Sequence, residues 1–318
     1  MNAAPARSVG IDVGGTKCLG VAVDQTGHVV AELRRPTPRG EGSLPQLIET
    51  LAEIAESLGP YSELGVGVPG LVTRNGVLRA APNLDGVANF DVAARLGERV
   101  GRTVHVDNDA TCATVAEWMY GAGSGTSEMV LVTLGTGIGG GLVAGGHLQR
   151  GRNGFAGEFG HMIVDPDGPP CPCGRRGCWE RYASGSGLAR LAREAAEGRR
   201  ATRVLELAGG DPEAVRGEMV QQAAREGDPD SLAVIDEFGR WVAIGLVSLT
   251  NALDPEMFVL GGGLAAGSDI YLDPIRRWFA ELIYQPELRL LPAIEFAAWT
   301  ERAGAVGAAL LHLVHEPG

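Results

Sequence analysis

The sequence predicts an α/β protein of two domains. Its 318 residues are about twice the ~150 typical of one domain. Stretches typical of strands and of helices alternate along the chain, as they do in α/β proteins. The segments 8–23 and 129–144 resemble each other at a constant offset of 121 residues, which places Thr133 on Asp12 and Gly135 on Gly14. We therefore expect two similar halves, each offering a strand–turn–strand loop to a central ligand cleft.

The spacing of apolar residues indicates the individual elements. Apolar runs bounded by turn residues predict strands, and the helix over 45–58 depends on Leu47, Leu51 and Ile54 with Pro45 near its start. In the first half, strands are expected at 8–13, 18–23, 29–33, 64–68 and 103–106, and helices at 45–58, 90–100 and 110–120. In the second half, strands are expected at 129–134, 257–260 and 294–298, and helices at 186–197, 213–226, 231–253, 271–284 and 303–315.

These elements group into two expected domains. A small domain comprises residues 1–118 together with the final helix, 303–318. A large domain comprises residues 119–302 and includes a segment rich in glycine, proline and cysteine over 151–180.

The composition excludes some partners. The 27 Lys and Arg against 39 Asp and Glu give a formal charge of −12, which argues against nucleic acid as a main partner. It does not argue against an anionic ligand, because backbone N–H groups can bind phosphate. The 48 glycines exceed the ~22 of average usage and indicate tight turns and places where the backbone approaches a ligand.

Nothing in the sequence indicates a membrane segment. The most apolar stretch, 241–253, carries Ser248, Thr250 and Asn251 and falls short of the ~20 apolar residues that a span needs. The first twelve residues contain no apolar core of a signal peptide. Five unevenly spaced cysteines fit a reducing compartment, so we expect a cytoplasmic protein that binds no membrane.

Two glycine turns are candidate phosphate sites. In Asp12-Val-Gly-Gly-Thr-Lys17, glycines can turn N–H groups toward an anion, Lys17 adds a positive charge, and Asp12 is an oxygen ligand suited to Mg²⁺. A plain hairpin turn with a solvated lysine is the alternative. The second turn, 135–141, contains a formal G-x-G-x-x-G, but a strand and not a helix is expected to follow it. A dinucleotide fingerprint requires that helix, so we reject it in favour of a phosphate turn.

A third run, Gly261-Gly262-Gly263, follows an apolar strand. A single turn with positive φ seldom needs three glycines, so we favour close contact with a ligand over a simple turn.

Cysteines and one histidine form a candidate metal site. Cys171, Cys173 and Cys178, with His161 ten residues upstream, supply the Cys₃His set typical of Zn²⁺. Four protein ligands leave no open position, so the zinc is expected to be structural. Free thiols or a disulfide are the alternatives, and a disulfide fits the expected reducing compartment poorly.

Carboxylates complete the candidate site. Asp109 lies between a strand and a helix, where an N-cap is the alternative to a catalytic role. Glu158 and Glu180 flank the metal motif. They could be surface charges, but an ion at His161 would fix the loops that carry them and preorganise a polar pocket.

Together these motifs resemble those of the ROK sugar kinases, and most of all the family's zinc-containing bacterial glucokinases. The resemblance runs from Val9 to about Leu313. Its most specific parts are residues 12–17, 108–110, 134–141, 158–161 and 171–180. One departure is Thr111-Cys112, where many members have Asn-Ala.

The resemblance implies a two-domain actin-like or hexokinase (ribonuclease H-like) fold and transfer of phosphate from ATP with Mg²⁺ to glucose. It implies Asp109 as the catalytic base. It implies sugar contacts from Asn83, Asn108, Asp109, Glu158, His161 and Glu180, and ATP contacts from Asp12, Gly14, Gly15, Thr16, Lys17, Thr133, Gly135, Thr136, Gly137, Gly261, Gly262 and Gly263.

Several alternatives stay open at this point. The substrate could be N-acetylmannosamine, N-acetylglucosamine or fructose, and the phosphate donor could be polyphosphate. A sugar-sensing regulator without turnover is a different class, which the retained Asp109 and both phosphate turns disfavour. We also expect a homo-oligomer, either a dimer or a tetramer.

Overall fold

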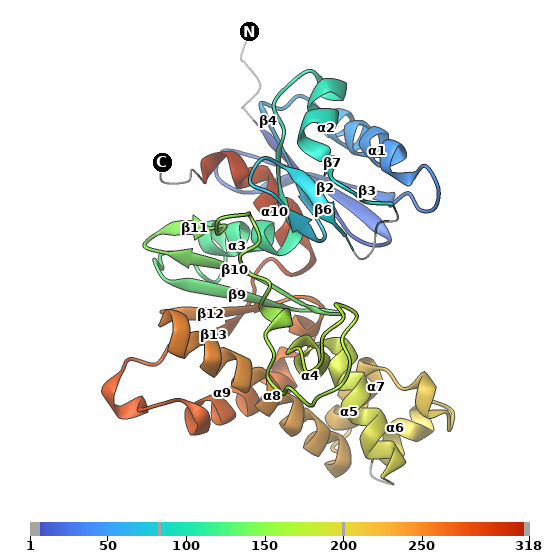
Figure 1. Cartoon of the computed structure of the whole chain (residues 1–318), viewed down its shortest axis with the longest axis vertical. Helices are drawn as coiled ribbons and strands as arrows, with labels where there is room; N and C mark the ends of the chain where they lie inside the picture. Colours follow the sequence, from blue (N-terminus) through green and yellow to red (C-terminus); the bar gives the residue numbers. More distant parts are fainter. Residues whose placement is uncertain (1–6, 82–83, 85, 199–200, 315–318) are drawn as a thin grey trace. The chain divides into compact units, whose positions relative to one another are not determined.

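The computed structural model describes residues 7–81, 84, 86–198 and 201–314, which divide into two compact units. Unit 1 comprises 1–131, 141–157 and 298–318, and unit 2 comprises 132–140 and 158–297 (Figure 1). The chain therefore changes unit four times, with the last change between Ala297 and Ala298. Compared with the expected boundaries, unit 1 also contains the segments 119–131, 141–157 and 298–302.

Unit 1 is built on a five-stranded sheet of order β3-β2-β1-β4-β8. Its strands are β1 (Ser8–Val13), β2 (Lys17–Val23), β3 (Val29–Pro36), β4 (Glu63–Val68) and β8 (His105–Asn108). Strands β1, β2 and β3 form an antiparallel meander, whereas β4 and β8 run parallel to β1. The carboxyl ends of β1, β4 and β8 consequently meet at one edge, which is where ligands bind in open α/β sheets.

Alternating side chains of this sheet form two hydrophobic cores. Val9, Ile11 and Val13 of β1 pack with α1 (Ser43–Ser57) and α2 (Val92–Val100). Leu19 and Val21 of β2 pack instead with α3 (Asp109–Tyr120) and α10 (Ala303–Leu310).

Helix α10 lies directly on the sheet. A Cβ built at Gly10 would lie 2.0 Å from the Ala305 carbonyl oxygen, and one at Gly65 would lie 1.8 Å from that of Ala308. Glycine at both strand positions is therefore what lets the helix approach so closely.

The second sheet has the order β11-β10-β9-β12-β13 and repeats the topology of the first. Its strands are β9 (Met129–Leu134), β10 (Ile138–Ala144), β11 (His147–Gln149), β12 (Met257–Gly261) and β13 (Ala293–Phe296). Adding 121 to the bounds of β1 and β2 gives those of β9 and β10. This agreement confirms the internal repeat.

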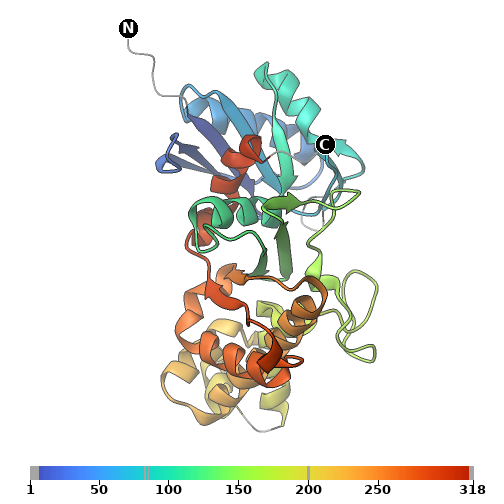
Figure 2. The same ribbon diagram turned by 90° about the vertical axis from the view of Figure 1, so that its left-hand side faces the viewer.

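The helices of unit 2 are α4 (Glu180–Ala183), α5 (Gly185–Glu197), α6 (Thr202–Leu207), α7 (Gly217–Arg225), α8 (Pro229–Leu253) and α9 (Ser268–Leu282). A largely irregular loop over 158–180 projects from these helices (Figure 2).

The expected helices and strands are confirmed with shifts at many of their ends, but several short elements were missed. Helix α10 ends at Leu310 and continues as a 3-10 turn to Leu313, so the helix expected over 303–315 is too long. Helix α6 and the small sheet of β5 (Leu71–Val72), β6 (Val77–Ala80) and β7 (Phe90–Asp91) were not predicted. No described helix is both long and apolar enough to cross a membrane.

Candidate active site

Two carboxylates lie close together in unit 1. Asp12 is near the end of β1, and Asp109 is the first residue of α3, directly after β8. Burial, followed by repulsion from Asp109, raises the pKa of Asp12 to about 7, against a smaller opposing effect of Lys17. Two acids that repel each other in this way form an arrangement suited to a cation or to proton transfer.

Asn108, and not Asp109, is the N-cap of α3. Its Oδ1 accepts from the N–H groups of Ala110 at 2.8 Å and Thr111 at 3.1 Å, and its amide donates to the Gly70 carbonyl at 3.1 Å. The capping role, which was the alternative to a catalytic role for Asp109, therefore belongs to Asn108. Asp109 Oδ1 itself accepts from the Ala110 N–H at 2.8 Å, which orients its carboxylate at the helix start.

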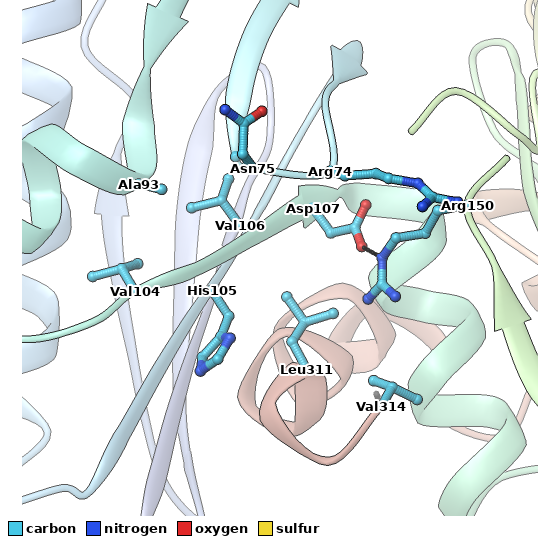
Figure 3. A pocket seen from close by; sticks show the side chains of 11 residues that line it. Arg74, Asn75, Ala93, Val104, His105, Val106, Asp107, Arg150, Leu311 and Val314 are labelled. Carbon is cyan, nitrogen blue, oxygen red and sulfur yellow. Dashed lines mark hydrogen bonds and ion pairs between the residues drawn. The ribbon is translucent and has the colours of Figure 1, made fainter. Parts of the chain in front are cut away.

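A cavity of about 280 Å³ opens on the outer edge of β8 (Figure 3). Arg150 Nε donates to Asp107 Oδ2 at 2.6 Å inside it, and Asp107 Oδ1 accepts from the Asn108 N–H at 2.9 Å. This mostly buried ion pair supports the strand end that carries Asn108. Neither Asn108 nor Asp109 lines the cavity, so we assign no substrate to it.

The first glycine turn is held by residues that the sequence did not single out. Gly14 N–H donates to the Lys17 carbonyl at 2.9 Å, while the Thr37 hydroxyl donates to the Gly14 carbonyl at 2.7 Å. Arg39 Nε donates to the Gly15 carbonyl at 3.1 Å and adds a cation beside the turn. Lys17 Nζ pairs with Glu301 at 3.0 Å, and both side chains are about half exposed. Thr37 and Arg39 follow β3, some twenty residues away, so no local motif marks them.

The second and third glycine motifs lie together in unit 2. The turn after β9 closes with the Gly135 N–H donating to the Gly137 carbonyl at 3.0 Å, and Thr133 Oγ1 accepts from the Gly139 N–H at 3.1 Å. Gly262 has φ of 83°, and a Cβ there would lie 2.6 Å from the Leu134 carbonyl oxygen. Strand β10, not a helix, follows the second turn, which confirms that it is no dinucleotide fingerprint.

The structure brings the four predicted metal ligands together. The ligand atoms of His161, Cys171, Cys173 and Cys178 all lie within 4.8 Å of one another. The Sγ atoms of Cys173 and Cys178 are 3.6 Å apart, close to the ~3.8 Å edge expected of a tetrahedron with ~2.3 Å Zn–S bonds. The donor set and its spacing thus fit a tetrahedral zinc ion.

The thiols of this cluster differ in their pKa. Burial, with a contribution from the Glu180 carboxylate, raises the pKa of Cys171. The pKa of Cys173 is lowered: burial opposes this, but the Arg175 N–H and the neighbouring thiols stabilise its thiolate.

Glu158, His161 and Glu180 form a polar cluster against the metal ligands. His161 Nε2 lies 3.9 Å from Glu158 Oε2, and its Nδ1 lies 3.9 Å from Glu180 Oε1. Burial raises the pKa of Glu158 above its ordinary value. The nearby His161 opposes this rise, and the Glu180 carboxylate adds to it. Glu180 Oε1 also accepts from the Cys171 thiol at 3.0 Å.

This polar cluster contacts the second glycine turn within unit 2. A Cβ at Gly137 would lie 2.7 Å from Glu180 Oε2, and one at Gly160 would lie 2.3 Å from the Ile138 carbonyl oxygen. The turn expected to hold phosphate and the residues expected to hold sugar are therefore neighbours.

Trp179 fixes this neighbourhood, although the sequence analysis did not single it out. It lies between ligand Cys178 and Glu180, is fully buried, and donates from Nε1 to the Trp241 carbonyl at 2.8 Å. Its ring packs so closely on α8 that a Cβ at Gly245 would lie 2.0 Å from it. The expected sugar contact Asn83 lies outside the described residues.

Comparison with known proteins identifies the family of the chain. The model of the ROK family matches residues 8–315, nearly the whole chain. The chain belongs to the ROK family. It is 37% identical over 313 residues to a glucokinase of Streptomyces coelicolor, covering 98% of both chains. An N-acetyl-D-glucosamine kinase of Yersinia pseudotuberculosis is 34% identical over 324 residues, covering 96% of this chain and 99% of that one.

Solved structures confirm the predicted fold of this ROK protein. A ROK glucokinase of Streptomyces griseus in complex with glucose and AMPPNP has a TM-score of 0.84 and 37% identity, covering 96% of this chain and 99% of that one. The chain thus has the predicted actin-like, two-sheet fold.

Proposed function

We propose that the chain transfers the γ-phosphoryl group of ATP to a hydroxyl of glucose, which gives glucose 6-phosphate and ADP. The contact between Glu180 and Gly137 carries this proposal. A sugar hydroxyl that Glu180 binds would stand beside a turn suited to phosphate. Membership of the ROK family and the glucokinase relatives support ATP as donor and glucose as acceptor.

Asp109 is the proposed general base. It takes the proton of the attacking hydroxyl, whose oxygen then bonds to the γ-phosphorus while the bond to the leaving ADP breaks. Asn108 supports this role, because its cap fixes the first turn of α3 and hence the backbone of Asp109. A general base contributes ~10²–10⁴-fold to such a rate.

Backbone N–H groups of the two glycine turns and the charge of Lys17 are proposed to hold the phosphates. Lys17 must exchange its Glu301 partner for phosphate, which costs little because both side chains are about half exposed. Asp12 is the residue that would hold Mg²⁺. When bound, the cation neutralises charge on the phosphates.

His161 and the three cysteines are proposed to bind a structural zinc ion. These ligands lie on the loop that also carries Glu158, and the last of them, Cys178, lies two residues before Glu180. Their geometry supports the view that this loop is rigid before sugar binds.

Phosphorylation of an N-acylhexosamine is the second candidate, favoured by the N-acetyl-D-glucosamine kinase relatives. A coupled assay of ADP release over glucose, N-acetylglucosamine, N-acetylmannosamine and fructose tests both candidates. We expect kcat/KM for glucose to exceed the others by ~10-fold or more, because polar groups that the bound sugar covers reject a changed substituent. A higher value for an N-acylhexosamine would replace glucose, and sugar binding without turnover would identify a sensing protein. Polyphosphate in place of ATP tests the donor.

A further inference from the structure

Glu117 is a fully buried acidic residue of α3, two turns after Asp109. Its carboxylate accepts three backbone hydrogen bonds. Oε2 accepts from Ala122 at 2.9 Å and from Ala298 at 3.0 Å, and Oε1 accepts from Trp299 at 2.8 Å. Burying an acidic side chain is costly unless donors satisfy its oxygens, and these three N–H groups do so.

The chain after α3 is shaped around this side chain. The Glu117 carbonyl accepts from the N–H groups of Gly121 at 3.1 Å and Gly123 at 3.0 Å. A Cβ at Gly121 would lie 2.1 Å from Glu117 Oε2. Glycine is therefore required at residue 121 for the carboxylate to keep its position.

The residues that Glu117 binds lead into α10. Ala298 is the first residue of unit 1 after the chain leaves unit 2, and α10 begins five residues later. Near the start of α10, a Cβ at Gly304 would lie 2.7 Å from Asp12 Cγ. One turn further, a Cβ at Gly307 would lie 1.6 Å from the Cys112 carbonyl oxygen of α3. Helix α10 is thus in contact with both Asp12 and the helix that carries Asp109.

We propose that Glu117 is a positioning residue for phosphoryl transfer. By fixing the backbone at 298–299, it sets where α10 begins, and α10 in turn holds Asp12 in place relative to Asp109. The proposal rests on the proposed function. It assigns Glu117 to the nucleotide side of the reaction, because its effect passes through Asp12 and not through the polar cluster of unit 2.

Glu117→Gln tests this role. Glutamine keeps the size of the side chain but replaces one carboxylate oxygen with an NH₂ group, which cannot accept from the backbone N–H groups that this oxygen bound. Three measurements are needed: hydrogen exchange over residues 298–304, equilibrium Kd values for Mg·AMPPNP and for glucose, and kcat. We expect faster hydrogen exchange at 298–302. The Kd for Mg·AMPPNP should be ~10-fold higher and kcat ~10-fold lower than in wild type, since small displacements are costly in phosphoryl transfer. The Kd for glucose should stay within ~3-fold of wild type.

Leu96→Ala is the matched control, because it removes a fully buried side chain of unit 1 on α2, in the core that contains no residue of α10. It should lower Tm but leave both Kd values unchanged. Equal losses of nucleotide and glucose affinity in Glu117→Gln, or nucleotide affinity unchanged despite faster exchange, would overturn the proposal.

Glu117→Asp provides a second variant if glutamine prevents folding. It keeps the charge but withdraws the carboxylate by about 1.5 Å, so it should show the same pattern of effects. Failure of the proposed function would appear differently, as wild-type protein without sugar-dependent ADP release. The exchange and nucleotide-binding measurements would still decide the role of Glu117.

Discussion

The carboxylate of Glu180 occupies the space that a side chain at residue 137 would need. A Cβ at Gly137 would lie 2.7 Å from Glu180 Oε2, while Glu180 Oε1 accepts from the Cys171 thiol. One carboxylate therefore links the proposed phosphate turn, the proposed metal ligand Cys171 and, through His161, the proposed sugar site. This relationship makes Glu180 the most informative residue to change.

Glu180→Gln is expected to keep the metal but weaken sugar binding. Glutamine fills the same space but lacks the charge and one of the two acceptor oxygens. A sugar hydroxyl enclosed in the site is then left poorly paired. The KM for glucose should rise ~10-fold or more and that for ATP far less. Steady-state kinetics on protein of known zinc content measures both values.

Glu197→Gln, an exposed substitution on α5, is the control for the loss of one charge in unit 2. An unchanged glucose KM in zinc-replete Glu180→Gln would mean that the loop stiffens the fold without touching the substrate.

Asp109→Asn should fold and bind sugar, because asparagine can keep the hydrogen bond from the Ala110 N–H. Its kcat should fall by ~10²-fold or more, the scale of a lost general base. Since Asn108 caps the helix, loss of stability is not expected to accompany the loss of rate. Thermal unfolding and kcat measured on the same sample separate the two effects, and turnover within a few-fold of wild type would remove Asp109 from the mechanism.

Local signals explain what the sequence could predict. Apolar runs bounded by glycine turns are enough to define β1, β2 and their repeats β9 and β10. The four metal ligands lie within 18 residues, so their spacing alone indicates a common site. The remaining contacts depend on segments far apart in the sequence, as with Thr37 and Arg39 at the first turn or Glu117 with residues 298–299.

Two points that the sequence did not settle have local causes. Asn108 and Asp109 are both good capping residues, so the sequence alone does not decide which one caps α3. The strands β5 and β7 have two residues each, too few to show a period of two.

Cys173→Ala should lower both zinc content and Tm. Wild-type protein is expected to carry about one zinc ion per chain, because three thiolates and one imidazole complete a tetrahedral site. His161→Gln should reduce zinc content and sugar affinity together. Cys18→Ala, which alters a buried cysteine outside the cluster, should leave the zinc in place. Metal analysis of protein made with zinc available checks this, and wild-type protein without zinc would refute the assignment.

In metal-free and nucleotide-free protein, the contribution of Asp12 to stability should fall as pH rises. Its pKa is about 7 in the folded state against an ordinary value of 3.8. Between about pH 4 and 7 Asp12 holds a proton in the folded state that it has released in the unfolded state, so its contribution to the free energy of unfolding decreases through this window. The full effect above pH 7 is at most about 4 kcal/mol, and less because Asp12 keeps some contact with solvent.

Asp12→Asn isolates this contribution, because asparagine does not titrate. The free energy of unfolding of Asp12→Asn relative to wild type should increase from pH 4.5 to 7.5, so that the variant gains stability over wild type while losing kinase activity. Urea unfolding of both proteins at several pH values measures this difference and cancels the other titrating groups. A difference that stays constant with pH would show that Asp12 is ionised throughout, with its repulsion from Asp109 relieved by other groups.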